Sequence, residues 1–196
     1  MKTELAIFPL PLVLLPGEYL PLRIFEARYL DMVATCLRDK EPFVLSPVLK
    51  SNQNEDHLTA IGTTANILEW DKREDTTLHI IIQGSEKVSI NRPASKSNGL
   101  IMAETTLIKD SDSELSEEDF AFLKNSLEIN GLFGLEKATI NSKSAAEIAY
   151  EIASFIHLGP IEKFSILSED TGAKKLLLIE KYLSDYVTPV KHTTLH

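Results

Sequence analysis

An apolar segment near the N-terminus, divided by prolines, restricts the fold of this chain more than any other feature. The run from Leu5 to Gly17 contains Pro9, Pro11 and Pro16. Proline has no backbone N–H to donate and clashes with the preceding helical turn. The run is therefore unsuited to the helical core of a signal peptide, and it is shorter than the roughly 20 apolar residues that cross a bilayer as a helix. We expect short buried strands here and no association with a membrane.

Short strand-like runs continue to about residue 108, separated by polar stretches rich in residues that favour turns. One helix interrupts them between Phe25 and Asp39, where Phe25, Tyr29 and Cys36 fall on one apolar face. This helix is expected to lie against the sheet or to close one end of a barrel. The expected strands are Leu5–Phe8, Val13–Leu15, Tyr19–Leu22, Phe43–Leu49, Leu58–Trp70, Thr77–Ile82, Lys87–Ile90 and Ile101–Ile108, with Trp70 among the expected burial points.

The second half of the chain has helical spacing. It follows an acidic stretch, 109–118, that we interpret as a solvated linker. Serines followed three residues later by an acid, at Ser116 and Ser144, are typical of capping boxes and predict helix starts. The pair Gly159-Pro160 predicts the end of one helix and the start of a short one. A last helix is expected from about Ser168 to Val187.

These patterns predict an α+β chain and no doubly wound parallel sheet, because strands and helices do not alternate. We expect a mostly antiparallel β-barrel with one inserted helix over residues 1–108 and a linker over 109–118. A helical bundle is expected over 119–188 and a flexible tail over 189–196.

Charge and motif content exclude several function classes. The formal net charge is −9 at pH 7, which argues against nucleic-acid binding, because phosphate contact needs a concentrated positive surface. The chain has one cysteine and no CxxC or HExxH pattern, so neither a disulfide framework nor a zinc cluster is expected. Glycine-rich phosphate loops are missing as well. We therefore expect no cofactor and no metal, and the single thiol favours a cytoplasmic location.

Isolated chemistry-bearing residues favour structural interpretations. Cys36 lies on the apolar face of its helix, where a buried thiol is inert. His79 lies among large aliphatic residues, and we interpret it as a satisfied or edge-exposed side chain. The alternative is a small-molecule-binding or hydrolytic site around His79, or around Glu26 and Arg28. No catalytic residue is assigned.

The densest group of unusual residues lies in the first 29 positions. Prolines there fix the angles of short strands and remove donors from edges. We interpret the charged pair Glu26 and Arg28 as a brace between helix and barrel, with part of a ligand groove as the alternative. Arg28→Ala should then cost about 1–3 kcal/mol, and Phe25→Ala about 3–5 kcal/mol if Phe25 is core. The motif residues, interpreted as structural, are Pro9, Leu10, Pro16, Gly17, Leu22, Phe25, Glu26, Arg28 and Tyr29.

The segment FPLPLVLLPGEYLPLRIFEARYLDMV, residues 8–33, resembles the Lon N-terminal domain family, the substrate-binding domain of the ATP-dependent Lon protease. Weaker similarity continues to residue 187. The resemblance implies a PUA-like β-barrel followed by a helical bundle, together one Lon N-terminal domain. The sequence departs from the family pattern at 71–75 and 84–88, so no basic or aromatic contact is transferred there. The family's ATPase and protease motifs do not occur in these 196 residues, and a stand-alone member is expected.

The resemblance implies a non-catalytic module that binds unfolded or extended polypeptide in an apolar groove between barrel and helices. Such a module would deliver the polypeptide to a separate protease. The residues of the groove are not assigned. RNA binding by a PUA-like module is a further alternative, and a homodimer formed through the helical half is left open.

Overall fold

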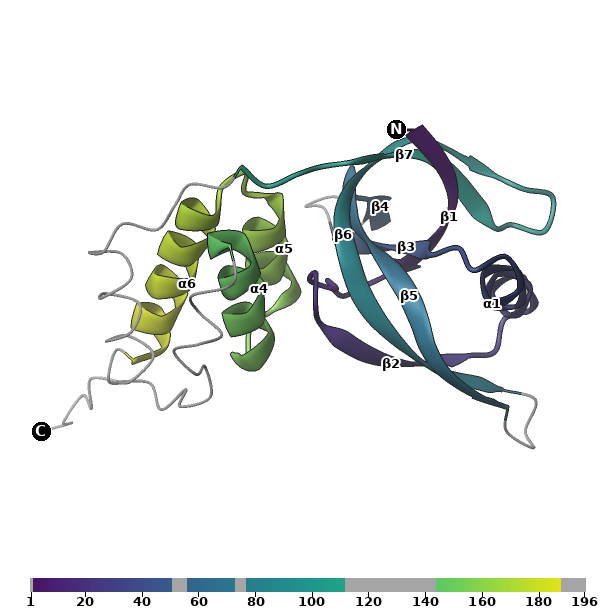
Figure 1. Cartoon of the computed structure of the whole chain (residues 1–196), viewed down its shortest axis with the longest axis horizontal. Coiled ribbons are helices and arrows are strands. Elements are labelled where there is room, and N and C mark those ends of the chain that lie inside the picture. The colour runs from purple at the N-terminus through teal and green to yellow at the C-terminus, as the bar shows by residue number, and fades with distance from the viewer. Residues whose placement is uncertain (1, 51–55, 73–76, 112–143, 188–196) are drawn as a thin grey trace, which may run out of the picture.

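The computed structural model describes residues 2–50, 56–72, 77–111 and 144–187. A strongly curled sheet with one helix at its side is followed by three helices that pack on one another (Figure 1). The strands are β1 (Lys2–Leu10), β2 (Tyr19–Ile24), β3 (Phe43–Lys50), β4 (Asp56–Leu58), β5 (Ile61–Lys72), β6 (Leu78–Ser95) and β7 (Ile101–Leu107). The helices are α1 (Ala27–Asp39), α4 (Ala145–Phe155), α5 (Pro160–Ser168) and α6 (Gly172–Val187). None of these described helices is long and apolar enough to cross a membrane.

Strand β1 is paired on both of its edges. It runs antiparallel to β7, with Leu5 opposite Ala103, and parallel to β3, with Ile7 opposite Val44. The other pairings, β3–β5, β5–β6, β6–β7, β2–β6 and β3–β4, are antiparallel. The sheet is mostly antiparallel, as expected, and mixed because β1–β3 is a parallel pairing: the chain crosses over through β2 and α1, so β1 and β3 run in the same direction. The pairings β1–β7–β6–β5–β3–β1 form a ring. Among the described strands β2 pairs only with β6 and β4 only with β3, so these two strands leave free edges and the sheet as a whole is not the closed barrel that was expected.

Four of the expected strands differ from those observed. Residues 13–15 are buried but irregular and form no strand. The segments 77–82 and 87–90 belong to a single strand, β6. Gly84 does not break β6; it allows a close approach instead, because a Cβ atom there would lie 2.2 Å from the carbonyl oxygen of Leu15. The expected strand 58–70 is divided between β4 and β5, and Trp70, expected to be buried, is 60% exposed near the end of β5.

Helix α1 begins at Ala27, two residues later than the spacing suggested, and packs its apolar face against the inside of the sheet. Its buried residues are Tyr29, Met32, Val33 and Cys36. They join a core that includes Phe8, Phe43 and Ile80 from three different strands.

Helices α4, α5 and α6 share a separate apolar core. Helix α4 starts with the expected capping box, in which the Ser144 hydroxyl accepts from the Glu147 amide and the Glu147 carboxylate accepts from the Ser144 amide. Helix α5 starts at Pro160, as expected. The helix expected to begin near Ser116, most of the linker and the tail lie outside the described residues. The most deeply buried helical residues of this core are Ile148, Ala149, Ile152, Ala153, Ile166, Leu167 and Ile179.

A buried ionic cluster joins the sheet to these helices. Asp110, which follows β7, accepts from the ammonium groups of Lys87 on β6 and Lys175 on α6 and from the Tyr150 hydroxyl of α4, the last at 2.7 Å. The Lys175 ammonium also donates to the carbonyl oxygens of Ile166 (2.9 Å) and Glu169 (2.6 Å) at the end of α5. Lys175 is fully buried and Lys87 is 3% exposed. Because isolated buried charges are costly, this cluster fixes how the helices sit on the sheet.

Candidate functional site

The Leu15–Glu18 segment forms a tight turn that explains two residues of the sequence motif. The Glu18 amide donates to the Leu15 carbonyl oxygen at 3.1 Å, with Pro16 and Gly17 at the two central positions. Gly17 has a φ of +84°, the left-handed conformation that a type II turn requires at its third residue and that glycine adopts without strain. The turn is held against β6 by hydrogen bonds between Gly17 and Gly84 and between Gly84 and Glu18. Pro16 and Gly17 therefore shape the chain and do not line the groove described next.

Seven of the nine motif residues line one groove. It has a volume of about 810 Å³ and lies where the end of β1, the end of β2 and the start of α1 meet. We call it the motif groove. Its motif residues are Pro9, Leu10, Leu22, Phe25, Glu26, Arg28 and Tyr29; the rest of its lining is Phe8, Pro11, Arg23, Ile24, Val48, Leu58 and Ile101.

Val48, Leu58 and Ile101 in this groove were not found by sequence reasoning. They come from β3, β4 and β7, far from the motif in the sequence. Their position follows from the pairing of β1, which places Ile7 opposite Ile101. No local pattern in the sequence signals this contact.

Arg28 links the start of α1 to the turn between β6 and β7. Its guanidinium donates to the carbonyl oxygen of Gly99 at 3.1 Å and contacts the Glu26 carboxylate at 2.7 Å. It also lies over the Tyr29 ring, 4.7 Å from the ring centroid. Burial raises the pKa of the Tyr29 phenol, against a smaller lowering by the neighbouring Arg28 charge. Glu26 and Arg28 thus contact each other, and the geometry accommodates both the brace and the groove interpretations.

Phe25 has a different environment from the one expected. It precedes α1 and is 69% exposed, whereas Tyr29 is 6% exposed and stacks on Phe8 with ring centroids 4.3 Å apart. The expectation that Phe25 shares the buried face of the helix is therefore wrong: the helix starts at Ala27, so the helical spacing does not extend back to Phe25. Phe25 is instead a large apolar side chain at the rim of the motif groove.

The chemistry available in the groove is that of binding. Its lining is mostly aliphatic and aromatic, with Arg23, Glu26 and Arg28 as its charged groups. In the described part of the chain no group of three or more His, Cys, Asp or Glu side chains could hold a metal ion. The Cys36 thiol lies outside this groove, and burial, with a smaller contribution from Glu41, raises its pKa to about 11. His79 lies on β6, exposed, opposite Arg23 and Asp71 on the neighbouring strands.

The groove is not where an apolar groove was expected, between sheet and helices. At that junction Val13 and Leu15 pack into the core of α4, α5 and α6, and Glu18 forms an ion pair with Lys163 of α5. The motif groove lies instead on the sheet and α1.

Residues 4–185 match the family of the ATP-dependent protease La (LON) substrate-binding domain. Two curated proteins are similar over 85% of this chain: Lon protease 2 of Syntrophobacter fumaroxidans, 26% identical over 186 residues, and the Lon protease of Vibrio parahaemolyticus, 22% identical over 178 residues. The chain spans 22% of the length of each of these two relatives.

Two solved structures are also similar. The Lon N-terminal domain protein from Xanthomonas campestris is 30% identical with a TM-score of 0.74, and the match covers 92% of this chain and 98% of that one. The N-terminal domain of the Lon protease of the Mycobacterium avium complex has a TM-score of 0.71 over 94% of this chain and 100% of that one. At 15% identity the second likeness concerns the fold alone.

Proposed function

The chain belongs to the family of Lon substrate-binding domains, and on this premise we propose that it is a non-catalytic module that binds extended or partly unfolded polypeptide in the motif groove. The family name describes substrate binding as part of an ATP-dependent protease. The proteolytic and ATP-dependent activities of the longer relatives are not carried over to this chain.

The exposed Phe25 side chain carries this proposal. A large aromatic ring that is 69% exposed beside an apolar groove offers surface that binding of an apolar segment would cover. The groove volume, about 810 Å³, lies within the range of roughly 300–1,000 Å³ that ligand sites occupy. Pro9 of β1, Pro11 just after β1 and the end of β2 form part of its walls, and the prolines limit the freedom of the backbone there. A groove of this kind suits an extended chain with bulky apolar side chains.

Titration of a permanently unfolded, fluorescently labelled protein tests the proposal. Reduced and carboxymethylated lactalbumin should increase its fluorescence anisotropy on adding this chain, and native lactalbumin should not. Phe25→Ala should weaken the binding at least about fivefold, as truncation of an aromatic side chain that a bound segment covers does. Because Phe25 is exposed, the same change should alter the free energy of unfolding by no more than about 0.5 kcal/mol, which replaces the larger cost expected of a core residue.

Phe155→Ala is the matched control. Phe155 is 67% exposed, but it lies on α4 and not at the groove. Unchanged binding by this control supports the location of the site. Equal weakening by both variants, or no binding of unfolded protein by the wild-type chain, would contradict the proposal.

The finer expectations stay predictions. They are delivery of the polypeptide to a separate protease, a homodimer through the helical half, the PUA-like and helical-bundle descriptions, and a cytoplasmic location. The same holds for the division at residues 108 and 118.

A further inference from the structure

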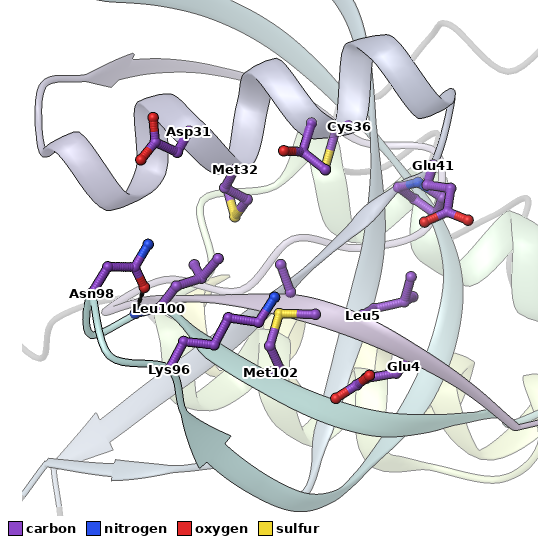
Figure 2. A pocket seen from close by; sticks show the side chains of 13 residues that line it. Glu4, Leu5, Asp31, Met32, Cys36, Glu41, Lys96, Asn98, Leu100 and Met102 are labelled. Carbon is purple, nitrogen blue, oxygen red and sulfur yellow. Dashed lines mark hydrogen bonds between the residues drawn. The ribbon is translucent and has the colours of Figure 1, made fainter.

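A second cavity, of about 200 Å³, lies farther along α1 than the motif groove and shares no lining residue with it. Figure 2 shows α1 along one side of this cavity, with β1 and the turn between β6 and β7 along the other. Its floor is apolar: Met32 is 2% exposed, Leu5 and Leu100 are 7% exposed, and Met102 is half-buried. A dry cavity of about 150 Å³ can hold a benzene-sized ligand. This cavity therefore has room for a short aliphatic chain.

The rim of the same cavity is acidic. Glu4 of β1, Asp31 of α1 and Glu41, two residues after α1, all line it and are all exposed. In the described part of the chain none of these three carboxylates forms an ion pair. Lys96 is the one basic residue of the lining, and Figure 2 shows its ammonium end among the side chains of the cavity. The rim thus has an excess of negative charge.

Nearby negative charges also affect the single cysteine, which lies inside the cavity. Cys36 is part of the lining and is 8% exposed. Burial is the main reason that its pKa is raised to about 11, and the charges of Glu41 and Asp39 raise it further. An acidic rim would favour a cation in this cavity for the same reason that it disfavours the thiolate.

From these observations we propose that the cavity binds an aliphatic cation, a short alkyl chain that ends in an ammonium or guanidinium group. The alkyl chain would lie on Met32, Leu100 and Met102, and the charged end would lie at the rim near Asp31 and Glu41. Two sources share this chemistry: a free amine, and the lysine or arginine side chain of a polypeptide. The proposal does not depend on the function of the motif groove, because the two cavities are lined by different residues.

Binding of three matched six-carbon ligands tests the proposal, with chemical shifts of backbone amides as the readout. Hexylammonium should bind saturably with a dissociation constant in about the millimolar range, at least about fivefold more tightly than hexanol or hexanoate. The shifts should map to Asp31, Cys36 and Leu100, and added salt should weaken the binding. Equal binding of hexanol and hexylammonium, or no saturable binding of hexylammonium, would overturn the proposal.

Variants of the charged lining residues test whether the charged end of the ligand lies at the rim. Asp31→Asn and Glu41→Gln should each weaken hexylammonium about two- to fivefold, as expected for a partly exposed ion pair. Lys96→Gln should strengthen it, because a like charge is removed. Glu69→Gln, on β5 and outside this cavity, is the matched control and should have no effect. If the Asp31 and Glu41 variants bind as the wild type does, the charged end is not held at the rim and the proposal fails.

The Cys36 thiol supplies an independent readout. A bound cation should stabilise the thiolate, so saturating hexylammonium should lower the pKa obtained from the pH dependence of alkylation by a small neutral reagent. Hexanol covers the thiol without adding a charge, so it should slow alkylation and should not lower that pKa. A pKa that is no lower with hexylammonium bound than with hexanol bound would overturn the proposal. Blocked lysine amide in place of hexylammonium then distinguishes the two sources: comparable affinity assigns a basic side chain, and binding of the free amine alone assigns a small molecule.

Discussion

At the scale of single residues, Arg28 connects three parts of the molecule through one planar group. It donates to Gly99, contacts Glu26 and lies over Tyr29, although its side chain is 35% exposed. We predict that Arg28→Ala lowers the free energy of unfolding by about 1–2 kcal/mol, from the lost hydrogen bond and the lost cation–π contact. Urea denaturation followed by circular dichroism measures this loss.

Arg28→Lys serves as the comparison for this prediction. Lysine keeps the charge but not the planar fork that reaches Gly99 and Glu26 together, so it should restore only part of the stability. A stability of Arg28→Ala within error of the wild type would contradict the role as a brace and leave the groove interpretation.

Lys175 should make stability depend on pH in the alkaline range. Burial lowers its pKa from 10.5 to about 8, an effect that Asp110 offsets in part. Between these two values the unfolded chain binds more protons than the folded one, so the contribution of Lys175 to the free energy of unfolding rises with pH. The difference in stability between the wild type and Lys175→Met should increase from about pH 8 to about pH 10 by at most roughly 1.4 kcal/mol per pH unit.

Chemical denaturation of both proteins across that range measures the difference. The effect of Cys36 on stability has the opposite sign. Its pKa is raised from 9.0 to about 11 in the folded state, so its contribution to the free energy of unfolding falls as the pH rises above about 9. Since both proteins contain Cys36, its effect cancels in the comparison. A difference that is constant with pH, or that falls as the pH rises, would contradict the prediction.

For single residues, the sequence predicted several contacts and buried positions correctly, but it did not predict which aromatic side chains are exposed. It singled out Glu26 and Arg28, which do contact each other, and it placed Cys36 and Tyr29 on the buried face of α1. It expected Phe25 and Trp70 to be buried, and they are 69% and 60% exposed. Aromatic residues occur both at the rims of grooves and in cores, so residue type alone does not predict exposure. Exposure here depends on where a helix or strand ends, and hydrophobic periodicity does not determine those ends.

At the scale of elements, capping explains where α4 begins. The Ser144 hydroxyl accepts from the Glu147 amide at 3.3 Å, and the Glu147 carboxylate accepts from the Ser144 amide at 2.7 Å. We predict that Ser144→Ala costs about 1 kcal/mol, since an N-cap side chain is lost while its neighbours stay in place. Thermal unfolding measures the cost. Ser154→Ala, within α4, is a control that should cost less, and a larger loss for Ser154→Ala would contradict the capping argument.

The edge of β2 illustrates a second local rule. The Gly84 amide donates to the Glu18 carbonyl oxygen at 2.9 Å, one step before the first pair of β2 with β6. Because hydrogen-bonded and non-bonded pairs alternate in antiparallel strands, the backbone of Pro21 faces the free edge of β2. Proline has no N–H to offer there, so this edge is a poor template for another strand.

The capping box and the proline edge were predictable because they depend on residues a few positions apart. The pairing of β1 with β3 was not, because it joins Ile7 to Val44 across a complete strand and helix. The continuity of β6 through Gly84 was missed for a related reason. A glycine in a sequence can indicate either a turn or a place where another part of the backbone comes close. At Gly84 it is the second, because the backbone of Leu15 lies against it.

At the scale of the whole molecule, the ionic cluster at Asp110 holds the helices and the sheet together. Its members, Lys87, Asp110, Tyr150 and Lys175, are spread over 89 positions of the sequence and come from the sheet, the segment after it and two helices. Sequence reasoning treated the residues around Asp110 as a solvated linker, because no local pattern distinguishes a largely buried aspartate from exposed ones in an acidic stretch. The molecule thus depends at this junction on contacts that no short segment contains.

We predict that Asp110→Asn uncouples these two parts. The change leaves two buried ammonium groups without a carboxylate, a loss of about 3–5 kcal/mol, and the loss falls on the contact between sheet and helices. Fluorescence of Trp70, the single tryptophan, follows the sheet, and circular dichroism at 222 nm follows mainly the helices. The two urea transitions should coincide in the wild type and separate in Asp110→Asn, with the helical transition at lower urea.

Asp170→Asn is the control. Asp170 is exposed and contributes only its backbone carbonyl to Ser111, so this change should leave the two transitions coincident. Coincident transitions in Asp110→Asn would mean that the apolar contacts of Val13 and Leu15 with α4, α5 and α6 are enough to couple the two parts.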